Sequence, residues 1–102
     1  MPRTTIQVNC GEVSRANAIA ASILSSNKYI QVNENGENVW KCGKGFLTAM
    51  KYIKLEFSGE HTLLISGWIR SVGGGEQDLS GVVGAIPKKQ ILNVMQKIQM
   101  AV

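Results

Sequence analysis

The sequence contains few residues that could bind a metal or carry redox chemistry. Cysteine occurs only at Cys10 and Cys42, with no C-x-x-C pair, and His61 is the single histidine. Three scattered ligands do not complete a tetrahedral zinc site, so we expect neither a metal nor a cofactor. In a reducing compartment, two such cysteines are more typical of small buried hydrophobic residues than of a disulfide, which would require them to face each other.

Long apolar runs are absent as well. No stretch approaches the roughly 20 residues that a membrane-spanning helix needs, and the segment from Met1 to Gly11 lacks the apolar centre of a secretory signal. We therefore expect no transmembrane segment and a cytoplasmic location. The 102 residues predict one domain, residues 1–102, which is long enough to bury a core without disulfides.

The sequence also lacks a pattern typical of catalysis. His61 follows Glu60 in an expected turn, no serine or cysteine is placed beside it, and the carboxylates are scattered. The glycines at Gly43 and Gly45 do not fit the phosphate loop G-x-x-x-x-G-K-[ST], and a strand rather than a helix is expected to follow them. We predict that the protein is not an enzyme.

Two periodicities are present along the chain. Alternating apolar residues predict strands, and apolar residues at helical spacing predict two helices, the second beginning near Pro87, which suits a first helical turn. Asn35-Gly36 predicts a tight hairpin, "SGEH" predicts a second turn, and "SVGGGEQD" (71–78) predicts a flexible loop. The expected strands contain Thr5–Cys10, Ile30–Val32, Val39–Cys42, Lys51–Ser58 and Leu63–Ile69, and the expected helices contain Val13–Leu24 and Pro87–Val102.

This order of elements predicts an α+β fold. Four consecutive strands joined by short connections form an antiparallel sheet, and each helix has one apolar stripe to bury. We therefore expect a two-layer sandwich of an antiparallel five-stranded sheet and two helices on one face, in the order β-α-β-β-β-β-α. The other face of the sheet is expected to be uncovered.

The element order resembles the TATA-binding-protein-like fold, which also underlies larger ligand-carrying proteins of the helix-grip kind. The segment "VWKCGKGFLTAMKYIK" (Val39–Lys54) is similar to a segment of a family of small uncharacterised bacterial α+β domains, with a tryptophan, a glycine pair and an "FLTA" step before a strand. The fold resemblance implies either nucleic-acid binding on an open sheet or a ligand held between sheet and helices, and fold does not choose between them.

The uncovered sheet face carries the candidate interaction residues. Successive strand residues point to opposite faces, so burial of Ile53, Leu55 and Phe57 places Tyr52, Lys54 and Glu56 outward. By the same parity, the outward residues of the other strands are Thr5, Gln7, Asn9, Tyr29, Gln31, Asn33, Leu64, Ser66, Trp68 and Arg70. The candidate interaction face is Tyr29, Tyr52, Lys54, Leu64, Trp68 and Arg70, and Lys41, Lys44 and Lys51 form a candidate basic edge.

Three functions are compatible with this face. A patch of large apolar groups such as Trp68 and Leu64 is typical of a protein interface, which favours a binding module for a protein partner or a second copy. The net charge of +4 leaves nucleic-acid binding as an alternative, with aromatics stacking bases and lysines contacting phosphates. An apolar-ligand carrier with a pocket near Trp40 and Phe46 is the third alternative, less favoured because a short domain has little spare volume.

Overall fold

The computed structural model describes residues 3–34, 36–42, 50–70, 76–77, 79 and 85–102. The α+β class and the order β-α-β-β-β-β-α are confirmed, with one short strand added before the last helix. The elements are β1 (Thr4–Asn9), α1 (Val13–Ser26), β2 (Ile30–Glu34), β3 (Glu37–Cys42), β4 (Met50–Ser58), β5 (Thr62–Arg70), β6 (Glu76–Gln77) and α2 (Ala85–Ala101).

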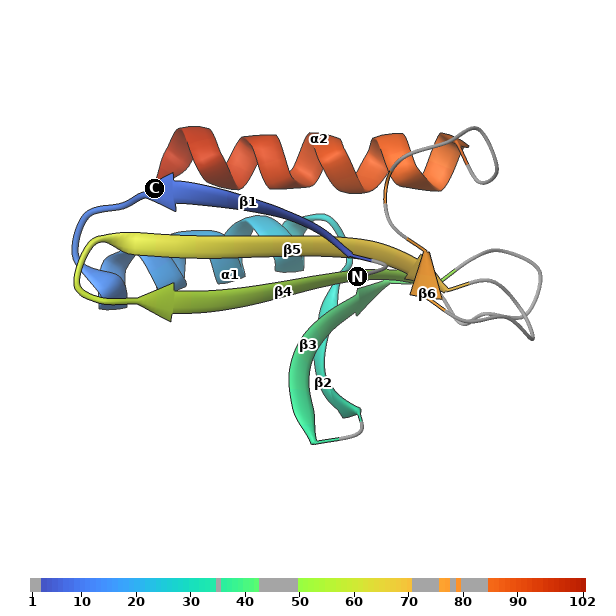
Figure 1. The fold of residues 1–102 in the computed structure, drawn as a ribbon, viewed down its shortest axis with the longest axis horizontal. Helices are drawn as coiled ribbons and strands as arrows, with labels where there is room; N and C mark the ends of the chain where they lie inside the picture. Colours follow the sequence, from blue (N-terminus) through green and yellow to red (C-terminus); the bar gives the residue numbers. More distant parts are fainter. Residues whose placement is uncertain (1–2, 35, 43–49, 71–75, 78, 80–84) are drawn as a thin grey trace.

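All the strands belong to one antiparallel sheet with the order β1-β5-β4-β3-β2, and β6 pairs with the end of β5 (Figure 1). The hairpin of β4 and β5 forms its centre and is paired from Met50↔Arg70 to Ser58↔Thr62. β1 and β2 are therefore the two edges. The prediction of a loop over 71–78 is wrong at Glu76 and Gln77, and the other residues of that stretch lie outside the described part of the chain.

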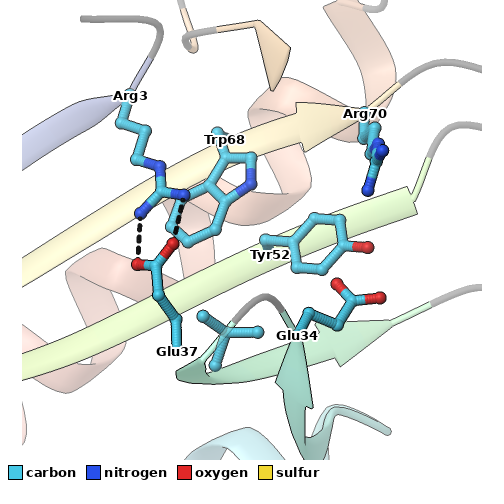
Figure 2. A pocket seen from close by; sticks show the side chains of 7 residues that line it. Arg3, Glu34, Glu37, Tyr52, Trp68 and Arg70 are labelled. Carbon is cyan, nitrogen blue, oxygen red and sulfur yellow. Dashed lines mark hydrogen bonds and ion pairs between the residues drawn. The ribbon is translucent and has the colours of Figure 1, made fainter. Parts of the chain in front are cut away.

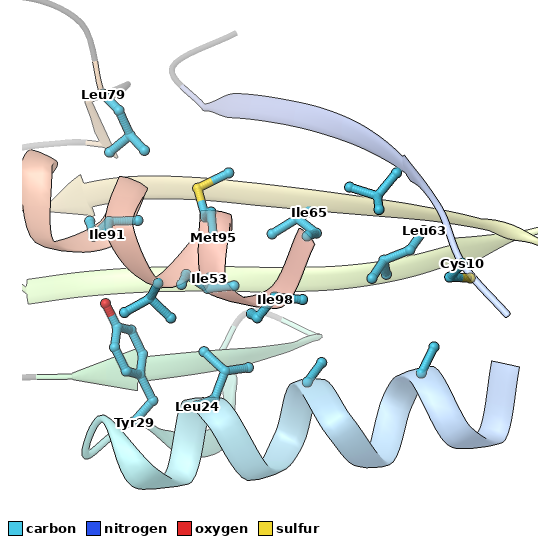
Figure 3. Close-up of a cluster of buried hydrophobic side chains, with 14 of the residues drawn as sticks. Cys10, Leu24, Tyr29, Ile53, Leu63, Ile65, Leu79, Ile91, Met95 and Ile98 are labelled. Carbon is cyan, nitrogen blue, oxygen red and sulfur yellow. The ribbon is translucent and has the colours of Figure 1, made fainter. Parts of the chain in front are cut away.

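Both helices pack on the same face of the sheet, as the apolar stripes predict. Leu24 of α1 and Ile91, Met95 and Ile98 of α2 share one buried cluster with the strand residues Ile53, Leu63 and Ile65 (Figure 3). Leu55 and Phe57 pack against the same cluster, so the predicted parity of β4 is correct. Both cysteines are free thiols, and Cys10 is buried in this core.

Gly67 lets α2 approach the centre of the sheet. A Cβ atom at Gly67 would lie 2.6 Å from Met95 Sδ and 2.8 Å from Ile91 Cγ2, both on α2. These distances are far shorter than ordinary carbon contacts. The absence of a side chain on β5 at this position is therefore what permits the close packing of the two layers.

The hairpin of β2 and β3 leaves the body of the sheet on the side away from the helices (Figure 1). Glu34 pairs with Glu37, and Gly36 has a φ of +81°, which confirms the tight turn, although Asn35 lies outside the described residues. Of β3, only the end from Trp40 to Cys42 pairs with β4. The rest of the hairpin can consequently bend across the outer face, the face away from the helices.

The register of the strands makes the predicted parity wrong for β2. Ile30 pairs with Lys41, and Lys41 pairs with Tyr52, which points to the outer face. Ile30 and, two residues on, Val32 therefore lie on the outer side of the sheet. Gln31 and Asn33 lie on the other side instead. Val32 packs against the cluster of Val39, Tyr52 and Trp68 on the outer face, whereas Ile30 stays largely exposed at the edge.

Candidate functional site

Two aromatic side chains form the centre of the outer face. Tyr52 and Trp68 lie directly opposite each other on β4 and β5, and their rings stack with centroids 5.4 Å apart and planes 3° apart. Both residues are only 2% exposed, because Val39 covers them, with Val32 and Met50 at the margin. The pair lies on the outer face, as parity predicts, but the prediction that it is exposed is wrong.

Cations lie at both ends of this aromatic pair. Thr4 pairs with Gly67, so Arg3 lies beside Trp68, and its guanidinium carbon is 3.8 Å from the ring centroid. Lys41 lies opposite Tyr52, with Nζ 5.9 Å from that ring centroid. Both distances are within the range of cation–π attraction. A cation, two stacked rings and a second cation thus form one row across the sheet.

Glu37 connects this row to the rest of the face. Its carboxylate accepts two hydrogen bonds from Arg3, Nη1 to Oε2 at 2.9 Å and Nη2 to Oε1 at 3.0 Å (Figure 2). Lys54 Nζ donates a third hydrogen bond to Oε2 at 2.9 Å. The bond from Arg3, and next that from Lys54, lowers the pKa of Glu37 to about 2. The same contact raises the pKa of Lys54.

A second ionic group surrounds the hydroxyl of Tyr52. Figure 2 shows this hydroxyl between the side chains of Glu34 and Arg70, and Lys41 Nζ lies 3.5 Å from Glu34 Oε1. Burial, and then the neighbouring Glu34 carboxylate, raises the pKa of Tyr52 to about 12, and the hydroxyl donates a hydrogen bond to Met50 Sδ at 3.7 Å. The phenol therefore keeps its proton at neutral pH and acts as a hydrogen-bond donor, not as a base.

The hollow between these two ionic groups is small. Its lining residues are Arg3, Glu34, Glu37, Val39, Tyr52, Trp68 and Arg70, and its volume is about 20 Å³. A cavity of that size holds about one water molecule. The outer face therefore offers a surface for contact rather than a pocket for a cofactor or substrate.

The predicted basic edge is not one surface. Lys41 lies on the outer face, whereas Lys51 pairs with Cys42 and Ile69 on the helix side and donates a hydrogen bond from Nζ to Gln90 Oε1 at 2.9 Å. Lys44 lies outside the described residues. The prediction that Lys41 and Lys51 share an edge is wrong, because Lys51 has the same parity as the inward-facing Ile53.

The remaining predicted face residues have different environments. Tyr29 precedes β2 and is buried in the helix-side core at 3% exposure, so its predicted place on the outer face is wrong. Leu64 is half-buried between its pairing partners Gln7 and Glu56, whereas Arg70 is exposed. Of the predicted residues, the outer face therefore brings together Tyr52, Lys54, Leu64, Trp68 and Arg70.

Sequence reasoning missed Arg3, Glu34 and Glu37 on this face and misplaced Ile30. Arg3 lies two residues before Thr5 and therefore has the same outward parity, so extending the predicted strand toward the N-terminus would have placed Arg3 on this face. The roles of Glu34 and Glu37 had no such signal, because their contacts depend on the bend of the hairpin. Ile30 was assigned to the core, but it is 63% exposed at the sheet edge.

The described residues contain neither a cluster of potential metal ligands nor a helix suited to span a membrane. His61 is exposed in the turn between β4 and β5, and no three side chains of His, Cys, Asp or Glu in the described ranges gather closely enough to hold a metal ion. Neither helix in those ranges has the length and hydrophobicity needed to cross a bilayer.

No protein-family model, curated protein or solved structure matches this chain. The resemblances to the TATA-binding-protein-like fold and to the small bacterial domains therefore stay predictions.

Proposed function

We propose that the protein is a binding module, not an enzyme, that associates with a second copy of itself through β2 and the adjoining outer face. The observation that carries this proposal is the exposure of Ile30, 63%, on an edge strand. A large apolar side chain and unpaired backbone groups at the same edge favour the addition of a strand from another chain.

The composition and position of β2 support this use. Its sequence, "IQVNE" (Ile30–Glu34), contains no proline and no lysine, the residues that commonly protect an edge strand from pairing. The hairpin also extends away from the helices (Figure 1), and β2 pairs with a neighbouring strand on one side only. Glu34 of β2 and Lys41 of β3 give this edge one charge of each sign, which suits pairing with an identical surface.

The ionic contacts favour a protein partner over nucleic acid. Lys54 and Arg3 bind Glu37, and Lys41 lies beside Glu34, so each of these cations has a carboxylate near it. The rings of Tyr52 and Trp68 are buried and are not available to stack bases. Nucleic-acid binding by the same face therefore remains the alternative, with less support.

The test is light-scattering mass across a concentration series for the wild type, Ile30→Lys and Met100→Lys. Met100 is 88% exposed on α2 and provides a matched loss of an exposed apolar side chain. We expect a concentration-dependent dimer in the wild type and in Met100→Lys, and a monomer in Ile30→Lys. A wild type that stays monomeric at high concentration, or that gains mass only with a nucleic-acid oligomer at low salt, contradicts the proposal.

A further inference from the structure

Tyr29 is the one side chain in the described part of the core that buries an unpaired polar atom. Its hydroxyl has no hydrogen-bond partner among the described residues, and Figure 3 shows it pointing from the end of α1 toward the sheet. Burial raises the pKa of Tyr29 above its ordinary value, so the phenol keeps its proton. A buried donor without a partner is unfavourable, and such a group calls for an explanation, of which a bound water or ion is one.

A groove on the helix side of the sheet lies beside this tyrosine. Tyr29 lines it together with Lys51 of β4 and Gln90, Asn93 and Lys97 of α2, and its volume is about 280 Å³. The three helix residues follow one another at spacings of three and four, so they share one side of α2. The groove therefore combines two ammonium groups, a phenol and side-chain amides, and its described lining contains no carboxylate.

One side-chain hydrogen bond and the backbone hydrogen bonds at the end of α1 make this groove compatible with an anion. Gln90 Oε1 accepts a hydrogen bond from Lys51 Nζ at 2.9 Å, which holds the lysine beside α2. The end of α1 also borders the groove through Asn27. The backbone N–H groups of Asn27, Lys28 and Tyr29 bond the carbonyls of the last turn of α1, which reduces the negative potential of that helix end.

We propose that this groove binds a small dianion of the phosphoryl type. The ammonium groups of Lys51 and Lys97 neutralise its two charges, and the hydroxyl of Tyr29, which has no hydrogen-bond partner among the described residues, donates a hydrogen bond to it. Charge-assisted hydrogen bonds of this kind are the strong ones in proteins, and lysine binds phosphoryl groups as a point charge. This site is separate from the outer face, because Lys51 and Tyr52 point to opposite sides of β4.

The test is a titration with inorganic phosphate at constant ionic strength, followed by the amide NMR shifts of β4 and α2. We expect saturable binding to the wild type. Tyr29→Phe and Lys97→Gln should each weaken it about tenfold, the loss of one charge-assisted hydrogen bond. Lys89→Gln is the matched control, because Lys89 is also an exposed lysine of α2 but does not line the groove, and its affinity should equal that of the wild type.

The thermal stability of Tyr29→Phe separates a binding role of the hydroxyl from a purely structural one. Because the substitution removes a buried hydroxyl that has no partner among the described residues, its thermal midpoint without phosphate should equal or exceed that of the wild type, although its phosphate affinity falls. Unsaturable shifts, equal weakening in Lys89→Gln and Lys97→Gln, or unchanged affinity in Tyr29→Phe would overturn the proposal. Acetate should bind more weakly than phosphate, and equal affinity would overturn the assignment to a dianion.

Discussion

Glu37 is the residue at which separate parts of the outer face meet. Its carboxylate contacts Arg3, 34 positions earlier in the chain, and Lys54, 17 positions later. Arg3 also lies over Trp68, so a single acidic side chain fixes a cation above the aromatic pair. These contacts stabilise the packing of the β2–β3 hairpin on the outer face, and they depend on the negative charge of Glu37.

Stability at low pH should therefore depend on Glu37. Its pKa is about 2 in the folded protein against an ordinary value of 4.5, so its contribution is present above pH 4.5 and is lost as the pH falls through 2. We expect the free energy of unfolding, measured with urea, to fall less steeply below about pH 5 in Glu37→Gln than in the wild type. Glu60→Gln, at an exposed turn residue, should keep the wild-type slope; equal slopes in all three would contradict this role.

The close packing of α2 against Gly67 predicts that this position does not tolerate a larger side chain. The methyl group of Gly67→Ala would overlap Met95 and Ile91 of α2, and overpacking of this kind costs about 1–3 kcal/mol. A Cβ at Gly11 would meet no atom within 4 Å, so Gly11→Ala should change the free energy of unfolding by less than about 0.5 kcal/mol. Denaturant unfolding of both variants checks the difference. If Gly67→Ala is as stable as Gly11→Ala, the close approach of α2 to β5 is not required.

At the level of elements, local sequence was sufficient where one face of an element meets the core. The alternation in β4 and β5 and the helical spacing in α1 and α2 each point to the same buried layer. The turn at Gly36 was predictable for a local reason, the positive φ that Asn-Gly favours. The strand β6 has two residues, too few for any periodicity to show.

The bend of the β2–β3 hairpin could not be predicted from local sequence. Ile30 and Val32 alternate with polar residues in the way that strands facing the helix layer do, so the pattern identifies a strand but not the layer that it covers. The contacts of Glu37 with Arg3 and Lys54 follow from the same bend. For this reason the aromatic pair was placed on the correct face of the sheet and given the wrong exposure.

Because the hairpin covers the outer face, the paired residues Val39 and Val32 should contribute unequally to the free energy of unfolding. Val39 is buried against Tyr52 and Trp68, whereas its pairing partner Val32 is half-buried at the margin. Val39→Ala should lower the free energy of unfolding by about 1–3 kcal/mol and reduce the near-ultraviolet circular dichroism of the ring pair. Val32→Ala should cost less than half as much. Equal costs would mean that the hairpin does not cover the rings.

On the scale of the whole molecule, the two faces of the sheet have different charge patterns. The outer face has cations and carboxylates in contact, including Glu37 with Arg3 and Lys54. The groove on the helix side has Lys51 and Lys97 without a carboxylate in its described lining. Part of the net charge of +4 is therefore concentrated on the helix side, which separates a surface suited to protein contact from one suited to a small anion.

Hydrogen exchange of the β2 amides tests the proposed self-association most directly. In an antiparallel pair, alternate residues of an edge strand point their N–H and C=O groups away from the partner strand. We expect these amides of β2 to become protected as protein concentration rises, in the wild type and Met100→Lys but not in Ile30→Lys. If β2 exchanges at the same rate in dilute and concentrated wild-type protein, the edge is not paired and the proposed function is wrong.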